Sequence, residues 1–303
     1  MPLPNSFRYS VLWEFWIGNS SNTLHQDGQL GPKASLAERI ERTVLSGVNS
    51  AEFPHAFAVR EAIRSWSFLQ LNPSILREPS SLLNPASLYP DGRYLPNVLA
   101  RIQSSDPLLL QDIARDLANI VPGLIGLHVE EDRPSDRYTL WATMEDGRSF
   151  SARLLSDGTL RMLALVTLAH DPQHQGVLCL EEPENGVHAM RMERIADLLC
   201  SLATDMQDPA DAQRPLRQLL VNTHSPALVK QPSMLPALIF AQTVTSVDAQ
   251  ASHALQRVTR MAPVIASTSA VSDHAYALDR IIEYLTSADA EEAVAELRGA
   301  RRL

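Results

Sequence analysis

The sequence GVLCLEEPEN, residues 176–185, contains the pattern that decides the fold. Four consecutive apolar residues run directly into the carboxylate pair Glu181 and Glu182, and Pro183 follows the pair. This pattern predicts a buried strand, and Pro183 favours an extended backbone at Glu182. Because successive side chains of a strand point in opposite directions, the strand end must bend if both carboxylates face one site. Open α/β sheets bind ligands at the carboxyl ends of their strands, so this pair is a candidate site; the simpler interpretation is a solvated strand end.

Helices and further strands are expected on both sides of this run. Short apolar strands that alternate with helices form parallel β-α units, with helices on both faces of the sheet. We therefore expect an α/β fold with a mainly parallel sheet flanked by helices. The predicted elements are helices over 159–169 and 189–202, strands over 177–180, 218–221 and 238–240, and closing helices over 275–285 and 290–297.

An antiparallel β segment is expected before residue 155. A helix begins at Pro107 with apolar residues at helical spacing, and Pro122-Gly123 ends it. The dipeptide Asp146-Gly147 is a strong signal for a hairpin turn. The predicted strands cover 125–129, 138–144 and 149–154.

The first hundred residues are less regular. Alternation of apolar and polar residues over 7–15 predicts a half-buried strand, and the composition of 18–35 predicts a loop. A second apolar stretch over 63–71 predicts another strand. The proline-rich segment 72–97 is expected to be an extended connector.

The composition is that of a soluble globular protein, with 45% apolar and 20% charged residues. The formal net charge of −9 argues against a broad basic surface for nucleic acid. Arg298, Arg301 and Arg302 form a local basic cluster, for which a solvated tail is the simpler interpretation. Nucleic-acid binding is therefore left open but is not indicated by the charge.

The sequence predicts a cytoplasmic protein without a membrane segment. The apolar run from Met162 to Ala169 is too short to cross a bilayer. The N-terminal apolar stretch contains the acidic residue Glu14, whereas the apolar region of a signal peptide contains no charged residue. Cys179 and Cys200 stand among apolar neighbours, which indicates buried free thiols.

A second motif, LSDGTLR at residues 155–161, directly precedes the predicted helix over 159–169. Ser156 and Asp157 are good N-cap residues, and Gly158 lets the backbone approach a ligand closely. Free N–H groups and the helix dipole make such a turn a candidate anion site, while the simpler interpretation is an ordinary helix cap.

A third motif, QLLVNTHSP at residues 218–226, is again an apolar strand that ends in polar residues. An imidazole at the end of a strand can bond a phosphate oxygen or orient a water, although an isolated histidine there is more often structural. His224 follows Glu182 by 42 positions, one strand-helix-strand unit later, which places it on a neighbouring strand.

These three motifs, in this order and spacing, resemble those of ABC-type ATPases of the RecF/SMC-like group, within the AAA family of ATPases. Residues 155–161 resemble the signature loop, 176–185 the Walker B strand with its catalytic glutamate, and 218–226 the switch histidine. Asn185 to His188 resembles the D-loop. The resemblance covers roughly residues 65–240 and implies a P-loop NTPase-like fold.

The resemblance also implies roles for individual residues, with ATP and Mg²⁺ as the cofactors. Glu181 would help to hold Mg²⁺ through water, although the family more commonly has Asp at this position. Glu182 and His224 would be catalytic, with Glu182 polarising the attacking water. The loop Ser156-Asp157-Gly158 would bind the γ-phosphate held by the opposite protomer.

By the same resemblance, residues 1–64 would be the remnant of an N-terminal ATPase lobe. Residues 65–303 would be the C-terminal lobe that carries the three motifs. The implied function is ATP binding and hydrolysis at an interface in a homodimer or with another ATPase chain. Relatives act in DNA repair or phage defence.

One family motif is absent from the 303 residues: the Walker A sequence GxxxxGK followed by Ser or Thr, which holds the phosphates. The nearest string, residues 28–35, has too few glycines and a proline that removes an N–H. A truncated or misplaced start, a loop supplied by a separate chain, or true loss would each explain this. The alternative function is therefore a nucleotide-inert interaction module that pairs with a complete ATPase. A nuclease or a serine hydrolase is not indicated, because the sequence after Pro226 has no DxD-type acid cluster and no nucleophile elbow surrounds Ser225.

Overall fold

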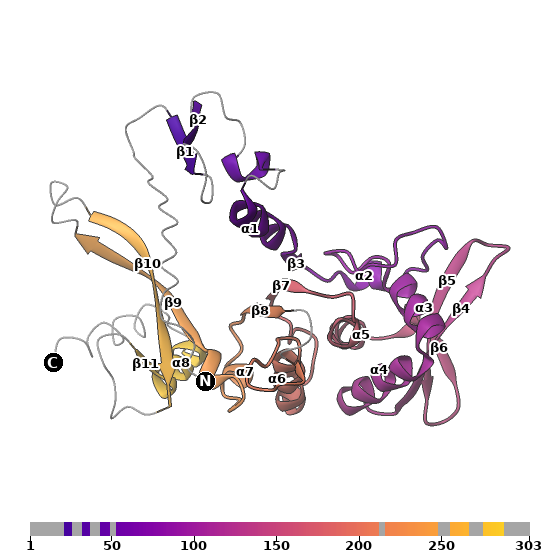
Figure 1. Cartoon of the computed structure of the whole chain (residues 1–303). Coiled ribbons are helices and arrows are strands. Elements are labelled where there is room, and N and C mark those ends of the chain that lie inside the picture. Colours follow the sequence, from indigo (N-terminus) through magenta and orange to yellow (C-terminus); the bar gives the residue numbers. More distant parts are fainter. Residues whose placement is uncertain are drawn as a thin grey trace. The chain divides into compact units, whose positions relative to one another are not determined.

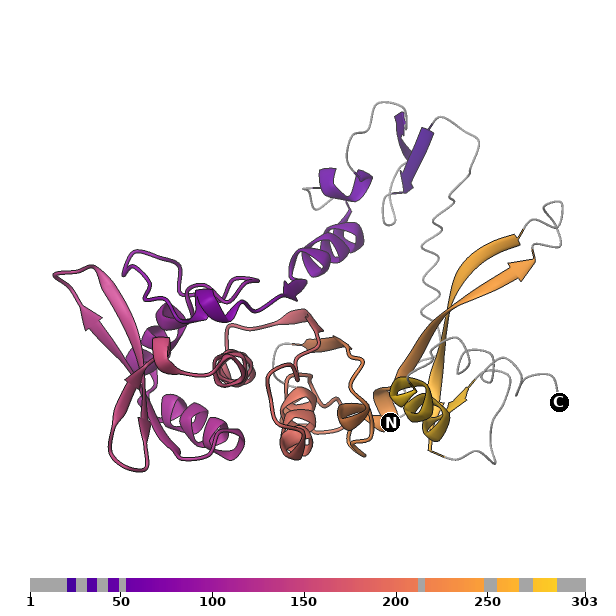
Figure 2. The same cartoon turned by 180° about the vertical axis from the view of Figure 1, so that it is seen from behind.

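The computed structural model describes residues 21–25, 32–36, 43–48, 53–211, 216–247, 255–266 and 275–287. The strand expected over 7–15, the helix expected over 290–297 and the C-terminal arginines lie outside the described residues. The chain divides into two compact units, Met1–Trp66 and Ser67–Leu303, each described by itself (Figures 1 and 2).

The first unit corrects two expectations. Part of the segment expected to be a loop forms two antiparallel strands. Their backbone groups form hydrogen bonds with each other, in a register that begins with Ser21 opposite Leu36. The predicted start of the strand over 63–71 is too early, because Pro54 begins a helix that continues through Ile63 and Arg64. The elements are β1 (Ser21–His25), β2 (Pro32–Leu36), a 3-10 turn (Val44–Gly47) and α1 (Pro54–Arg64).

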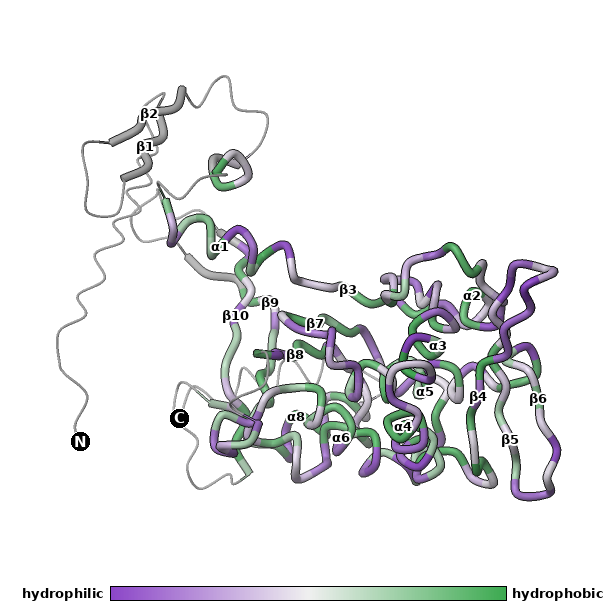
Figure 3. Tube along the Cα trace, turned by 45° about the vertical axis from the view of Figure 1, so that its right-hand side comes forward, coloured by the Kyte–Doolittle hydropathy of each residue, from purple (hydrophilic) through white to green (hydrophobic). Residues whose placement is uncertain are grey.

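The second unit is built on a parallel sheet of three strands in the order β3-β7-β8, which confirms the expected α/β fold. The apolar run of β7 is green along most of its length in Figure 3. In register, Phe68 lies opposite Cys179, and Cys179 lies opposite Leu220. The strands are β3 (Ser67–Leu69), β7 (Gly176–Glu181) and β8 (Arg217–Asn222).

The main core lies on one face of this sheet. Leu178 and Leu180 of β7 belong to one buried cluster with residues of α5 (Asp157–His170) and α6 (Met192–Ser201), the helices drawn below the sheet in both Figures 1 and 2. On the other face, the side chains of Phe68 and Leu220 are 64% and 59% exposed. The sheet is thus packed firmly on the side that carries the signature-like helix α5.

An antiparallel layer precedes α5, as expected. Its hairpin turns at Gly147, which has the positive φ of +80° that this turn requires. The last strand is shorter than expected because Ala152–Leu154 forms a 3-10 turn. The elements are α4 (Pro107–Ile120), β4 (Leu124–Asp132), β5 (Arg137–Met144) and β6 (Ser149–Ser151).

The segment 72–97 is not simply an extended connector. It contains the short helix α2 (Pro73–Leu76) and the beginning of α3 (Leu95–Ser105). Pro96 occupies the first turn of α3, where its missing N–H costs no helical hydrogen bond. A proline that indicated a break in the sequence therefore starts a buried helix.

The strand expected over 238–240 does not join the parallel sheet. It begins β9 (Ile239–Val247), which pairs antiparallel with β10 (Leu255–Ile265) in a separate sheet with β11 (Tyr276–Ala277). The helix expected over 275–285 is α8 (Leu278–Thr286), and α7 (Pro226–Val229) follows the histidine motif. In the described ranges no helix is long and apolar enough to cross a membrane.

The two cysteines are free, but they are not both buried. Cys179 is half-buried in the middle of the sheet, and Cys200 at the end of α6 is exposed. Partial removal of water from around each sulfur atom raises the pKa of both thiols. A raised pKa favours the protonated thiol, which is a poor nucleophile.

Candidate functional site

The Glu181-Glu182 pair lies at the carboxyl end of β7, at the edge where β8 also ends. Glu181 is opposite Asn222 in register, and the N–H of Glu182 donates to the carbonyl oxygen of Asn222 at 2.8 Å. The backbone of Glu182 has φ +44°, in the left-handed region. The expectation that Pro183 keeps Glu182 extended is therefore wrong.

A closed turn explains the conformation of Glu182. The Asn185 N–H donates to the carbonyl oxygen of Glu182 at 3.0 Å, and the Asn185 side chain donates to Glu182 Oε2 at 2.5 Å. These bonds hold the bend that the strand needs for its two carboxylates to line one site.

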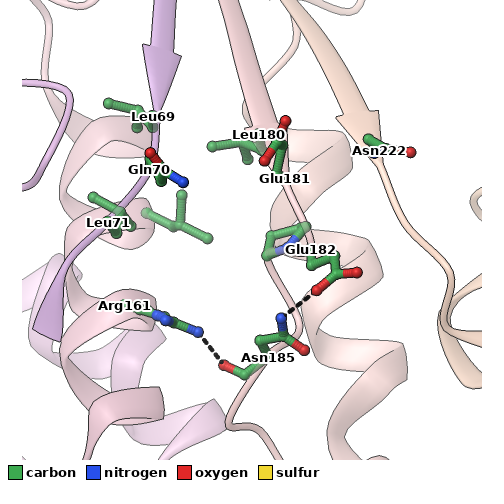
Figure 4. A pocket seen from close by; sticks show the side chains of 11 residues that line it. Leu69, Gln70, Leu71, Arg161, Leu180, Glu181, Glu182, Asn185 and Asn222 are labelled. Atoms are coloured by element: carbon green, nitrogen blue, oxygen red, sulfur yellow. Dashed lines mark hydrogen bonds between the residues drawn. The ribbon is translucent and has the colours of Figure 1, made fainter.

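A pocket of about 360 Å³ opens at this edge of the sheet (Figure 4). It contains both carboxylates together with amide groups and one cation. Apolar side chains of β7 and α5 form part of its wall. The polar lining residues are Gln70, Arg161, Glu181, Glu182, Asn185 and Asn222.

Arg161 supplies the positive charge in this pocket. It lies one turn into α5, and its guanidinium donates to the carbonyl oxygen of Asn185 at 3.1 Å. The cation is thereby held on the turn that carries Glu182. The site contains two acids and one arginine, so it can contact both a cation and an anion.

His224 lies two residues beyond the end of β8, which is the strand neighbouring β7, as its spacing from Glu182 predicts. Its side chain is exposed, and it is not among the residues that line the 360 Å³ pocket. The following residue, Ser225, caps α7 by accepting from the N–H of Leu228. The structure thus places His224 at the same sheet edge as Glu182 but outside the cavity.

Ser156, Asp157 and Gly158 lie elsewhere, at the N-terminus of α5. Ser156 and Gly158 line a second pocket of about 590 Å³ together with Gly186 and His188. The hydroxyl of Ser156 accepts the Thr159 N–H at 3.1 Å, so that N–H already has a partner within the chain. Within one chain, this loop and the two glutamates therefore line different pockets.

Asp157 and Gly158 have clear structural partners. Asp157 forms an ion pair with Arg77 at 2.5 Å, and Arg77 also donates to the carbonyl oxygen of Leu155 at 3.0 Å. A Cβ atom added to Gly158 would lie 2.2 Å from the carbonyl oxygen of Gly186. Glycine at 158 therefore permits close contact between the start of α5 and the loop after Glu182.

The acidic pocket fits the metal side of a magnesium nucleotide. Mg²⁺ takes oxygen ligands and commonly needs only one or two carboxylates, with water and phosphate completing its shell. Glu181 with the amide oxygens of Gln70 and Asn222 offers such a set. In the described part of the chain, no three His, Cys, Asp or Glu side chains form a metal cage. The phosphate side has Arg161 but no glycine-rich loop in the sequence.

Gln70, Arg161 and Asn222 were not expected at the site. Gln70 lies inside the strand expected over 63–71, Arg161 in the LSDGTLR motif, and Asn222 in the QLLVNTHSP motif. A polar residue at the end of each apolar run was the signal that could have identified Gln70 and Asn222. Arg161 became identifiable only when the fold brought α5 beside β7.

The fold is that of an α/β domain, and a family comparison places the chain in the nucleotide-binding ATPase class. A family model described as "AAA domain, putative AbiEii toxin, Type IV TA system" matches residues 13–230, more than half of the chain. The chain belongs to this AAA-domain family. The resemblance inferred from the motifs is confirmed at the level of the AAA family of ATPases.

Solved structures of SMC heads are distantly similar to the chain. An Smc head domain with coiled coil and joint from Pyrococcus yayanosii has 14% identity and a TM-score of 0.37, over 65% of this chain and 30% of that one. An Smc head with an extended coiled coil from Pyrococcus furiosus, bound to the C-terminal domain of ScpA, has 13% identity and a TM-score of 0.34, over 55% and 37%. The chain thus spans about a third of the length of these two structures. No curated protein sequence matches it.

Proposed function

We propose that the chain binds MgATP at the carboxyl edge of the β3-β7-β8 sheet and hydrolyses it. A phosphate-binding loop from a longer start or from a partner chain would complete the site. The observation that carries this proposal is the pocket that holds Glu181, Glu182 and Arg161 together at the ends of parallel strands. Membership of the AAA-domain family supports it.

Each residue of the edge has a proposed task. Glu181 would help to hold Mg²⁺ through water, and Gln70 and Asn222 would offer further oxygen ligands. Glu182 takes the proton of the attacking water, and the turn that Asn185 closes fixes its carboxylate. His224 donates to a phosphate oxygen from the neighbouring strand. Bound MgATP supplies the phosphoryl group that is transferred to water.

We also propose that the Ser156-Asp157-Gly158 loop acts on a nucleotide held by another subunit, in a homodimer or with a different ATPase chain. Its position in a separate pocket supports this, because it cannot serve the acidic pocket of its own chain without moving. The side chains of Ser156 and Asp157 are exposed and therefore accessible to a second subunit.

The test is ATP turnover by the purified chain, alone and mixed with a neighbouring ATPase chain. We expect Glu182→Gln to lower kcat by roughly 10²- to 10⁴-fold, because general-base catalysis contributes about that much. Glu145→Gln, an exposed glutamate in the β5–β6 hairpin, is the matched control and should keep the parent rate. Equal rates for the parent and Glu182→Gln would contradict the proposal.

The second candidate is a nucleotide-inert module that pairs with a complete ATPase. The absence of a GxxxxGK motif from the 303 residues favours it. Equilibrium binding of MgATP to the chain, with and without the partner, separates the two functions. Partner binding without any MgATP binding to this chain would support the module.

We propose that the chain acts in the cytoplasm. Its proposed biological role is phage defence, and DNA repair is the other candidate. The description of the family, which refers to a putative toxin of a type IV TA system, supports the first. Survival of cells challenged with phage, compared between the parent gene and Glu182→Gln, tests it. Equal survival would contradict a defensive role for ATP turnover.

A further inference from the structure

A buried acid next to the site has no task in the chemistry proposed above. Glu184 lies two residues after Glu182, and its side chain is only 7% exposed. One carboxylate oxygen accepts from the hydroxyl of Thr223, while Oε2 is enclosed and has no hydrogen-bond partner in the described part of the chain. Enclosing an unpaired carboxylate oxygen costs free energy, so stability alone is a poor reason for a glutamate at this position.

Thr223 connects this acid to the backbone around His224. The Thr223 hydroxyl has one proton, which it donates to Glu184. Its oxygen is therefore available as an acceptor, and the N–H of Ser225 donates to it at 3.0 Å. His224 lies between two residues that this pair of hydrogen bonds fixes.

A second bond joins the same two loops. The N–H of Glu182 donates to the carbonyl oxygen of Asn222 at 2.8 Å, at the end of the β7–β8 ladder. Residues 222–225 are thus tied to residues 182–184 at two points, one through the backbone and one through side chains. Removing the side-chain bond leaves the strand pairing intact but frees the turn that carries His224.

We propose that Glu184 is a positioning residue, which acts through Thr223 to hold His224 in place beside Glu182. The link itself needs no nucleotide. Its consequence for ATP turnover rests on the function proposed above. Because Glu184 does not line the 360 Å³ pocket, its removal should affect the catalytic step more than nucleotide binding.

The test is a double-mutant cycle in the full chain with Glu184→Ala and Thr223→Val. Hydrogen exchange at the Ser225 amide is the first measurement, because that N–H is the last member of the network. Either single change should accelerate exchange by about 5- to 30-fold, the usual effect of losing one hydrogen bond, and the double change should accelerate it no further. Glu145→Gln is the matched control and should leave the amide unchanged.

Conservative variants guard against a general folding defect. Thr223→Ser keeps the hydroxyl and Glu184→Gln keeps an acceptor oxygen, so both should retain most of the protection at Ser225. The NMR resonances of the His224 imidazole should shift in Glu184→Ala and Thr223→Val but not in Thr223→Ser. If Glu184→Ala fails to fold, Thr223→Val and Glu184→Gln alone still decide the question.

Turnover provides the last measurement. With an active preparation, Glu184→Ala should lower kcat and leave the KM for MgATP within about twofold. Unchanged exchange at Ser225 in Thr223→Val, or exchange effects that add in the double variant, would overturn the inference. If the parent never turns over ATP but Ser225 and His224 respond as expected, the proposed function fails and the positioning role of Glu184 stands.

Discussion

Glu182 combines the catalytic role proposed above with an unfavourable backbone conformation. A non-glycine residue at φ +44° costs on the order of 1–3 kcal/mol, and such costs are typical of functional sites. The conformation lets the second carboxylate of the pair leave the strand alternation and line the pocket with Glu181. The strain therefore follows from placing two adjacent acids at one site.

A pair of substitutions measures this strain. Glu182→Gly and Glu182→Ala both lose the bond from Asn185, but only glycine relieves the left-handed backbone. We expect the glycine variant to be more stable than the alanine variant by about 1 kcal/mol. Chemical denaturation measures the difference. Glu145 does not have a positive φ, so there the alanine variant should be more stable than the glycine variant. If the alanine variant were also the more stable one at Glu182, the backbone of Glu182 would be unstrained.

His174 should make stability depend on pH. Burial, and then the positive charge of Arg217, lower its pKa from the ordinary 6.5, and its Nε2 is enclosed with no hydrogen-bond partner among the residues that the structure describes. The folded state thus binds a proton at His174 less readily than the unfolded state, in which the ordinary pKa is 6.5. His174 contributes stability above pH 6.5, and that contribution is lost progressively as pH falls below it.

We expect His174→Gln to flatten the decrease in melting temperature between pH 7.5 and 5.5. His55→Gln, at an exposed position on α1, is the control and should follow the parent. An unchanged pH profile in His174→Gln would mean that His174 titrates alike in both states.

At this scale the sequence predicted part of the site. Glu181 and Glu182 were recognisable because acids directly follow an apolar run. The backbone conformation of Glu182 was not predicted. Pro183 favoured an extended Glu182, but the turn closed by Asn185 outweighed that preference. Gln70 and Arg161 escaped prediction since only tertiary packing brings them to the carboxylates.

At the scale of elements, the approach of α5 to the loop after β7 depends on Gly158. A methyl group there would meet the carbonyl oxygen of Gly186 at 2.2 Å, and backbone atoms cannot move as a flexible side chain can. We expect Gly158→Ala to destabilise the fold by about 1–3 kcal/mol, which lowers the melting temperature by several degrees. Gly47→Ala, with no atom within 4 Å of the added methyl, is the control. Equal melting temperatures for the two variants would contradict the close contact.

Elements with strong periodicity were predicted well, including α4, α5, β7 and β8. The missed helix α3 begins with Leu95-Pro96, and a proline in a first turn resembles a break in the sequence. The strand at 239 was recognised but assigned to the wrong sheet. Strand propensity is local, whereas the choice of partner depends on contacts such as those of Phe240 with Tyr276 and Tyr284.

At the scale of the whole molecule, the second unit has a core of its own. Its main buried cluster extends from Leu69 to Leu228. We expect a fragment that starts at Ser65 to unfold cooperatively, with a melting temperature within a few degrees of the full chain. Circular dichroism measures this. A fragment without a cooperative transition would show that residues 1–64 are required for the fold, contrary to their predicted separation as a lobe.

The segment 181–188 lines both pockets, with Glu181 and Glu182 at one end and Gly186 and His188 at the other. If a ligand at one end changes the affinity for a ligand at the other, the reverse effect has the same size, because linkage is reciprocal. If two subunits share nucleotides through these pockets, we expect nucleotide bound at one site to raise the affinity of the other site for nucleotide. We then expect a sigmoidal dependence of turnover on ATP, with a Hill coefficient above one that Gly158→Ala lowers. The segment would make the enzyme respond to a threshold concentration of nucleotide instead of in proportion to it.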